Sequence, residues 1–245
     1  MSKFNKKTEK QILQINTKIF ADGADLNSMF KLNSQKYIHG LTTNPTLMRK
    51  AGIKDYEKFA KIVLSKIKKK PVSFEVFSDD HNEMYEQAKK ISSWGRNAFV
   101  KIPICNTKKK YSYDLIKKLS HENVKLNITA IMTKDQIKKT YKSLNKDCSA
   151  FISIFAGRIA DTGVDPKDII KYAVKINKKY NSEIIWASTR ELLNIFQCAS
   201  LGCDIITVTP DIINKLENLN KDLEEYSLDT VKMFHKDAVL SKYKI

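Results

Sequence analysis

Short apolar segments alternate along the chain with longer amphipathic segments. The apolar segments, which we predict to be strands, cover residues 18–22, 37–44, 71–77, 98–104, 125–131, 150–157, 183–188 and 204–210. The segments between them carry apolar residues at helical spacing and cover 25–33, 54–69, 80–94, 111–121, 133–145, 166–180, 189–201 and 211–219. A strand followed by a helix, repeated eight times, is the pattern of a (β/α)8 barrel. We therefore predict an α/β protein built as one TIM barrel.

Two segments lie outside this pattern. A basic stretch over residues 1–15 precedes the first strand, and a further amphipathic helix is predicted over 228–242. The chain has 245 residues and no linker rich in Pro, Gly or Ser, and one such barrel typically needs about 250 residues. We therefore predict a single domain over 1–245, with an N-terminal extension and an additional C-terminal helix.

The composition indicates a folded, cytoplasmic protein. Hydrophobic residues make up 42% of the chain, which is enough for a sizeable core. No stretch approaches the roughly 20 consecutive apolar residues that a membrane span needs. The basic N-terminus lacks the apolar stretch and cleavage site of a secretory signal. We expect a cytoplasmic location and no membrane partner.

The formal net charge of +17 suggests a polyanion partner, but its composition argues against one. Only four of the 44 basic residues are arginine, the side chain that nucleic-acid readers favour, and the lysines are spread over the predicted helices. No helix-turn-helix, aromatic RNA-binding or zinc-finger pattern is present. We expect no specific nucleic-acid partner, and a polyanion-binding protein stays as the non-enzymatic alternative.

The cysteines and histidines show no ligand spacing. They are Cys105, Cys148, Cys198, Cys203, His39, His81, His121 and His235. Without a CxxC pair or a mixed His/Cys motif, the thiols are expected to be reduced and mostly buried. We expect no metal site and no organic cofactor.

Lys101 differs from the other lysines because it lies within an apolar strand, between Val100 and Ile102. Chemistry in a barrel takes place at the carboxyl ends of the strands and in the loops after them. A closed barrel has no edge strand, so a surface lysine here would require a different fold. A partly desolvated amine loses its proton more readily and can attack a carbonyl. We therefore predict Lys101 as a Schiff-base nucleophile.

Two carboxylates and two polar residues end neighbouring strands at the same mouth. Asp22 and Glu75 would carry the proton transfers of Schiff-base chemistry. The alternatives are that Asp22 caps the following helix and that Glu75 only pairs with Lys101. Asn127 and Thr129 are spaced by two and face the same way. They would orient water and the imine, or else satisfy backbone groups.

Two of the four arginines follow the sixth and seventh strands, where barrels frequently bind phosphate. Arg158, Ser188 and Arg190 therefore predict a phosphate site, since Arg offers paired hydrogen bonds to phosphate oxygens. The alternative pairs Arg158 with Asp161, and pairs Arg190 with Glu191 or places it on a helix face. Together with Lys101, these residues predict an enzyme acting on a phosphorylated carbonyl compound.

Several blocks of the chain resemble the transaldolase family, and most closely its short bacterial members. In family order they are FADGADL (20–26), GLTTNPTL (40–47), FVKIPI (99–104), LNITAI (126–131), FAGRIADTG (155–163) and WASTRE (186–191). The combination of TTNP with a VKIP embedded in a strand is specific to this family. The resemblance covers most of residues 18–242.

The resemblance implies a role for each matching position. Lys101 would form the Schiff base, Asp22 would take the proton in carbon–carbon cleavage, and Glu75 with Thr129 would hold the catalytic water. The positions implied to bind the dihydroxyacetone part are Thr43, Asn44, Asn127, Ser153 and Phe155. Those implied to bind phosphate are Arg158, Ser188 and Arg190.

The resemblance also implies the reaction. Related fructose-6-phosphate aldolases carry Gln where this chain has Glu75 and Tyr where it has Phe155, so both positions favour a transaldolase. A dihydroxyacetone unit would pass from sedoheptulose 7-phosphate or fructose 6-phosphate to glyceraldehyde 3-phosphate or erythrose 4-phosphate, in the non-oxidative pentose phosphate pathway. The enzymatic alternatives are an aldolase that releases free dihydroxyacetone and a transaldolase of a dedicated sugar pathway. Short members imply a homo-oligomer in which the helix over 228–242 packs on a neighbour.

Overall fold

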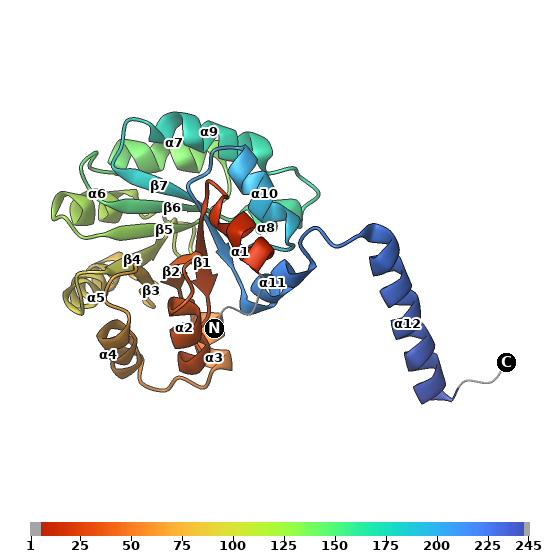
Figure 1. Cartoon of the computed structure of the whole chain (residues 1–245). Helices are drawn as coiled ribbons and strands as arrows, with labels where there is room; N and C mark the ends of the chain where they lie inside the picture. Colours follow the sequence, from red (N-terminus) through yellow and green to blue (C-terminus); the bar gives the residue numbers. More distant parts are fainter. Residues whose placement is uncertain (1–5, 243–245) are drawn as a thin grey trace.

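Eight parallel strands close into a barrel in the computed structural model, which describes residues 6–242 (Figure 1). Each strand pairs with its neighbours in sequence order, and the last pairs with the first. The strands are β1 (Lys18–Asp22), β2 (Ile38–Thr42), β3 (Val72–Glu75), β4 (Ala98–Pro103), β5 (Leu126–Ile131), β6 (Ala150–Ile154), β7 (Ser182–Trp186) and β8 (Ile205–Val208). The predicted (β/α)8 barrel is confirmed.

Helices surround the barrel where the amphipathic segments predict them. They are α2 (Leu26–Asn33), α4 (Tyr56–Lys66), α5 (His81–Ser93), α6 (Tyr113–His121), α7 (Lys134–Ser143), α9 (Lys167–Asn177), α10 (Leu193–Ser200) and α11 (Pro210–Asn214), the last continued by a 3-10 turn, η1 (Lys215–Asn218). A helix α1 (Lys6–Leu13) also forms within the predicted extension, of which residues 1–5 lie outside the described residues. No helix in the described part of the chain is both long and apolar enough to cross a membrane.

In two predicted strands, the residues at the carboxyl end cap or begin a short helix that lines the cavity. β2 stops at Thr42, since Asn44 caps α3 (Pro45–Lys50) and a proline fits the first turn of a helix. β6 stops at Ile154, and residues assigned to its end instead begin α8 (Ala156–Ala160). Both short helices lie at the carboxyl end of the barrel and carry site residues.

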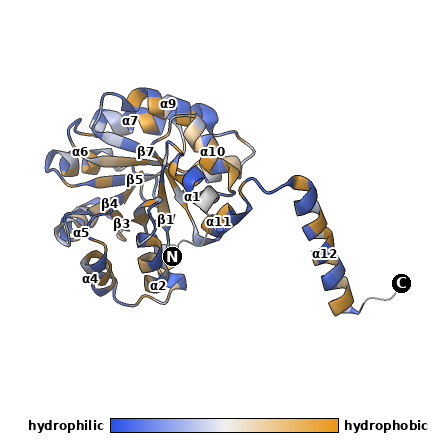
Figure 2. Ribbon diagram, viewed as in Figure 1, coloured by the Kyte–Doolittle hydropathy of each residue, from blue (hydrophilic) through white to orange (hydrophobic). Residues whose placement is uncertain are grey.

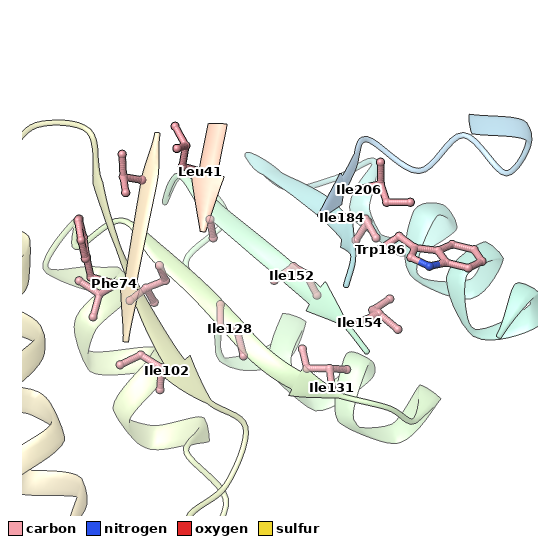
Figure 3. Close-up of a cluster of buried hydrophobic side chains, with 14 of the residues drawn as sticks. Leu41, Phe74, Ile102, Ile128, Ile131, Ile152, Ile154, Ile184, Trp186 and Ile206 are labelled. Carbon is pink, nitrogen blue, oxygen red and sulfur yellow. The ribbon is translucent and has the colours of Figure 1, made fainter. Parts of the chain in front are cut away.

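The apolar side chains form two layers. Those that point outward from the strands pack against the helices, as Figure 3 shows for Leu41, Ile128, Ile152 and their neighbours. Those that point inward fill the barrel, and the largest are Phe20, Phe99, Phe151, Ile185 and Ile205. Phe99 stacks on Phe151 with ring centroids 4.1 Å apart, and Phe20 meets the same ring edge-on at 5.5 Å.

Gly40 makes room for this inner layer. A Cβ at this position would lie 2.5 Å from the Phe20 ring, so any larger residue would displace the phenyl group. The aromatic layer closes the barrel from below. The polar side chains at the strand ends therefore stand above a layer of apolar side chains.

The last helix stands away from the barrel. α12 (Leu223–Ser241) begins five residues before the predicted helix because the Asp222 carboxylate accepts hydrogen bonds from Glu224 N and Glu225 N (Figure 1). None of its residues is buried, and Figure 2 shows apolar positions along its length. Its exposed large apolar side chains are Leu223, Tyr226, Leu228, Val231, Met233, Phe234, Val239 and Leu240.

Candidate active site

A cavity of about 400 Å³ opens at the carboxyl ends of the strands. Polar side chains from the strand ends line its lower part, and α3 and α8 form part of its wall. The lining residues are Asp22, Thr42, Asn44, Pro45, Thr46, Leu47, Glu75, Lys101, Asn127, Thr129, Ser153, Phe155, Arg158, Ala187, Ser188 and Thr207. This cavity gathers most of the residues predicted from the sequence.

Lys101 lines the cavity from β4 and is 7% exposed. Its Nζ donates a hydrogen bond to the carbonyl of Thr43 at 2.8 Å and lies 3.2 Å from Oε2 of Glu75. Buried charges are tolerated when they are paired and hydrogen-bonded, and both conditions hold here. The amine is thus held in a fixed position, with a carboxylate beside it.

Asp22 places a second carboxyl group in the cavity from the end of β1. Thr42 Oγ1 donates to its Oδ1 at 2.9 Å, and Asn44 Nδ2 donates to Oδ2 at 3.4 Å. Desolvation raises the pKa of Asp22, and the positive charge of Lys101 offsets part of this effect. The alternative role as a helix cap does not apply, because Asp25 accepts the Ser28 N–H that begins α2.

The TTNP segment contributes differently from the prediction. The Thr43 side chain is fully buried and donates to the carbonyl of Ser73 at 2.9 Å, so it lies outside the cavity. The predicted substrate contact of Thr43 must therefore be corrected: the residue acts through its carbonyl, which holds Lys101. Thr42, which the prediction missed, faces Asp22 instead. The alternation of β2 gives the reason, because every second residue points inward.

A hydrogen-bonded network forms the floor of the cavity. Ser153 Oγ donates to Asn127 Oδ1 at 2.6 Å, and Asn127 Nδ2 donates to Ser73 Oγ at 3.0 Å. All three side chains are at most 3% exposed. These bonds fix the orientation of the Asn127 amide and leave it one N–H for a ligand. Ser73 is a site residue that the sequence prediction missed, although it lies two residues before Glu75.

Thr129 Oγ1 is buried in the same cavity and has no hydrogen-bond partner within the described residues. A buried hydroxyl without a partner is costly, so it is suited to bind a water molecule or a substrate oxygen. The next residue, Ala130, has a φ of 62°, and the β5–β6 register shifts between Ile128 and Ile131. Such bulges frequently aim a side chain into an active site.

The predicted phosphate residues separate into two groups. Arg158 on α8 and Ser188 after β7 line the cavity. Arg190 lines a neighbouring hollow of about 370 Å³, where its Nε donates to Asp161 Oδ1 at 2.9 Å and its Nη2 donates to Asp161 Oδ2. These bonds hold the pKa of Asp161 below its ordinary value. Arg190 does have an acidic partner, but it is Asp161 and not Glu191.

Gly157 allows the turn that carries Arg158 and the turn that carries Ser188 to meet. A Cβ at this position would lie 1.6 Å from the Ser188 carbonyl oxygen, so only glycine fits against that backbone. Ser188 itself has a φ of 64°, in the left-handed region. The α8 turn and the β7 turn are therefore packed backbone against backbone. This contact sets the spacing between Arg158 and Ser188.

The arrangement supplies the groups that imine chemistry needs. It combines a buried amine, two carboxyl groups, a free hydroxyl and an arginine at the rim. Across residues 6–242, no three His, Cys, Asp or Glu side chains gather into a metal cluster. The remaining predicted residues, Asn44, Phe155 and Ser153, lie on the wall or floor of the same cavity.

A family profile and curated relatives all match this chain to the same family. A family profile described as "Transaldolase/Fructose-6-phosphate aldolase" matches residues 19–244. A curated "Probable transaldolase" of Nitrosopumilus maritimus is 34% identical over 221 residues, which cover 85% of this chain and 95% of that protein. A "Probable transaldolase" of Thermoplasma volcanium is 34% identical over 220 residues, again 85% and 95% of the two chains.

Solved structures support the fold alone. A crystal structure of a provisional lyase/mutase from Burkholderia cenocepacia J2315 superposes with a TM-score of 0.57 and 13% identity. The match covers 95% of this chain and 92% of that one. At this identity, the superposition bears on the barrel and not on the chemistry.

Proposed function

Because the chain belongs to the transaldolase/fructose-6-phosphate aldolase family, we propose that it is a transaldolase using Lys101 as its Schiff-base residue. It moves a dihydroxyacetone unit from a ketose phosphate, sedoheptulose 7-phosphate or fructose 6-phosphate, to an aldose phosphate. The acceptor is glyceraldehyde 3-phosphate or erythrose 4-phosphate, as in the non-oxidative pentose phosphate pathway. The observation that carries this proposal is Lys101, buried on β4 and placed beside Glu75 in a cavity that also holds Asp22.

Imine formation begins when the neutral Lys101 amine attacks the ketose carbonyl. A carbinolamine forms, takes up a proton and loses water, and Lys101 is left bound to the three-carbon end of the sugar. Glu75 lies beside the amine and Thr129 lines the same cavity from β5, and we assign to them the water that relays these protons. Asn127 and Ser153 are placed on the floor to bind the hydroxyl groups of the bound fragment.

Cleavage of the carbon–carbon bond requires a base at the adjacent hydroxyl group. We assign this role to Asp22, which takes the hydroxyl proton while the bond electrons move into the imine and form an enamine. The aldose phosphate then leaves. The raised pKa of Asp22 suits a group that takes a proton and returns it to the acceptor in the reverse step.

The phosphate group of the sugar is assigned to the rim formed by Arg158 and Ser188. Arg190 uses its Nε and Nη2 to bind Asp161, and Nη1 is not part of that pair. Arg190 can therefore join the phosphate site through Nη1, or after leaving Asp161. Guanidinium groups bind phosphate through paired hydrogen bonds, so Arg158 at the rim of the cavity, with Arg190 in the neighbouring hollow, favours a phosphorylated substrate.

Glu75 and Phe155 favour transfer over release of free dihydroxyacetone. The test is to incubate the enzyme with fructose 6-phosphate, with and without erythrose 4-phosphate, and to measure free dihydroxyacetone and sedoheptulose 7-phosphate. A transaldolase needs the acceptor for turnover. Steady release of dihydroxyacetone without an acceptor would assign the chain to the aldolase branch instead.

The non-enzymatic alternative makes a different prediction. Binding of polyanions that falls steeply with salt and survives loss of Lys101 would support it.

We also propose a homo-oligomer. The apolar side chains of α12 are exposed and the helix makes no buried contact with its own barrel. An unpartnered apolar helix face of this length is rare on a monomer. A second copy of the chain is the partner that we assign to it.

A further inference from the structure

The carbonyl of Glu75 lies where β2 stops supplying hydrogen bonds to β3. Leu41 N–H donates to Pro71 O at 2.9 Å, and Thr43 N–H donates to Ser73 O at 3.2 Å. If this pattern continued by two residues on each strand, the N–H of residue 45 would donate to the carbonyl of Glu75. Residue 45 is proline, which has no N–H. The segment after β2 therefore supplies no backbone donor for the carbonyl of Glu75, whose carboxylate belongs to the site.

The hydroxyl of Tyr56 takes the place of the missing donor. Its Oη donates to the carbonyl of Glu75 at 3.0 Å. Asp55 caps α4 through Lys58 N and so places Tyr56 at the first position of that helix, at the carboxyl end of the barrel. Burial raises the pKa of Tyr56 well above its ordinary value, so the hydroxyl keeps its proton and remains a donor.

The Tyr56 ring is held on three sides. Its centroid lies 4.4 Å from that of Phe77, 5.5 Å from that of Trp94 and 6.2 Å from that of Phe74, with tilted or edge-on geometry. Aromatic contacts of this kind fix a ring independently of its hydroxyl group. Replacing Tyr56 with Phe would therefore remove one hydrogen bond and leave the packing in place.

We propose that Tyr56 is a positioning residue for Glu75. Its hydroxyl completes the ladder that Pro45 interrupts, and it fixes the end of β3 so that Glu75 Oε2 stays 3.2 Å from Lys101 Nζ. On the opposite flank, Val76 N–H donates to the carbonyl of Lys101 at 3.2 Å. The strand end is thus held from both sides only while the Tyr56 hydroxyl is present. The inference rests on the proposed role of Glu75 in proton relay.

Loss of the hydroxyl would act on the rate of proton transfer more than on substrate binding. Tyr56 lies outside the cavity, and the groups assigned to the phosphate and the sugar hydroxyls come from other elements. A carboxylate that is displaced by a fraction of an ångström relays protons less well. We expect the Tyr56→Phe variant to lose about tenfold in kcat with little change in KM.

The experiment compares the wild type with Tyr56→Phe, Glu75→Gln and the double variant. The kcat and KM of dihydroxyacetone transfer are measured for each, together with thermal unfolding, and all rates are taken below the lowest melting temperature. If Tyr56 acts through Glu75, its substitution lowers kcat in the wild type and has no further effect in the Glu75→Gln background. The matched control is Tyr141→Phe, which removes a buried hydroxyl that donates to Asn177 Oδ1 at 2.8 Å on another side of the barrel. It should lower stability and leave kcat unchanged.

Two results would overturn the inference. One is a Tyr56→Phe variant with wild-type kcat. The other is that Tyr56→Phe lowers kcat by the same factor in the wild type and in the Glu75→Gln background. A wild-type enzyme that transfers no dihydroxyacetone and forms no Lys101 adduct would instead refute the proposed function. The two failures are therefore distinguishable within one set of measurements.

Discussion

At the scale of single residues, the site depends on charged groups that are kept out of water and paired. Lys101 and Glu75 share one short contact, and Asp22 is held by two donors from the β2 segment. Desolvation dominates the environment of Asp22, so its ionised form is costly in the folded protein. Function and stability therefore compete at this position.

Replacing Asp22 with Asn tests this competition. We expect transfer activity to be lost, because the amide cannot take a proton. We also expect the free energy of unfolding at neutral pH to rise by up to about 1 kcal/mol. The folded pKa of Asp22 lies above its unfolded value, so the wild type gains stability as the pH falls through the folded pKa. The advantage of the variant should therefore shrink in acid, as measured by thermal unfolding across pH. A variant that is less stable than the wild type at pH 7 would contradict this account.

At the scale of secondary-structure elements, the turns after the strands assemble the rim of the cavity, to which we assign phosphate binding. Arg158 and Ser188 come from segments that are distant in sequence, and Gly157 brings them together through a contact between backbones. Asn44 connects a short helix to the site in two ways. Its Oδ1 accepts the Leu47 N–H and caps α3, and its Nδ2 donates to Asp22. Short helices at the barrel mouth thus position polar groups that the strands alone do not reach.

Replacing Gly157 with Ala should separate phosphate binding from Schiff-base formation. The added Cβ must push the Ser188 backbone away, at a cost of about 1–3 kcal/mol in stability. We expect KM to rise for fructose 6-phosphate as donor and to change little for fructose, which has the same carbonyl and hydroxyl groups but no phosphate. The control is Gly95→Ala, whose Cβ would meet only ordinary contacts, the nearest at 3.4 Å from Leu64. An equal rise in KM for both donors would show that Gly157 does not act on the phosphate rim.

Most of the fold is predictable from the sequence because strands and helices differ in hydrophobic period. The prediction was wrong where local capping competes with that period, as at Asn44, which caps α3 and does not belong to β2. The strand ends also predicted Lys101, Asp22 and Glu75 as one cluster, which the cavity brings together.

The remaining site details depend on side-chain direction and on contacts between turns. Thr43 and Thr42 have the same chemistry, and only the inward or outward direction along β2 separates them. The pairing of Arg190 with Asp161 depends on how two turns pack, which no spacing in the sequence specifies.

At the scale of the whole molecule, the exposed apolar helix α12 contrasts with a barrel whose interior is tightly filled. Its apolar side chains, among them Val231 and Phe234, are 59% and 63% exposed. Burying such side chains at an interface would stabilise an assembly by about 1.5–3 kcal/mol each. The net charge of +17 would oppose association of copies at low salt.

The assembly can be tested with charged substitutions on α12. We expect the wild type to have a mass of two or more chains by light scattering, and the Val231→Asp/Phe234→Asp variant to have the mass of one chain. Lys232→Asp places an acidic group on the same helix without removing an apolar one, and it should leave the assembly intact. A wild type that is monomeric at micromolar concentration would refute the proposed oligomer.

The central claim is that Lys101 forms a Schiff base with a ketose phosphate. The most direct measurement is the intact mass of the protein after incubation with fructose 6-phosphate and borohydride, followed by peptide mapping, with Lys101→Arg as the control. We predict one reduced three-carbon adduct on the peptide that contains Lys101, and none in the variant. A folded wild-type protein without any adduct, with sedoheptulose 7-phosphate as well, would contradict the account, as would an adduct on a different lysine.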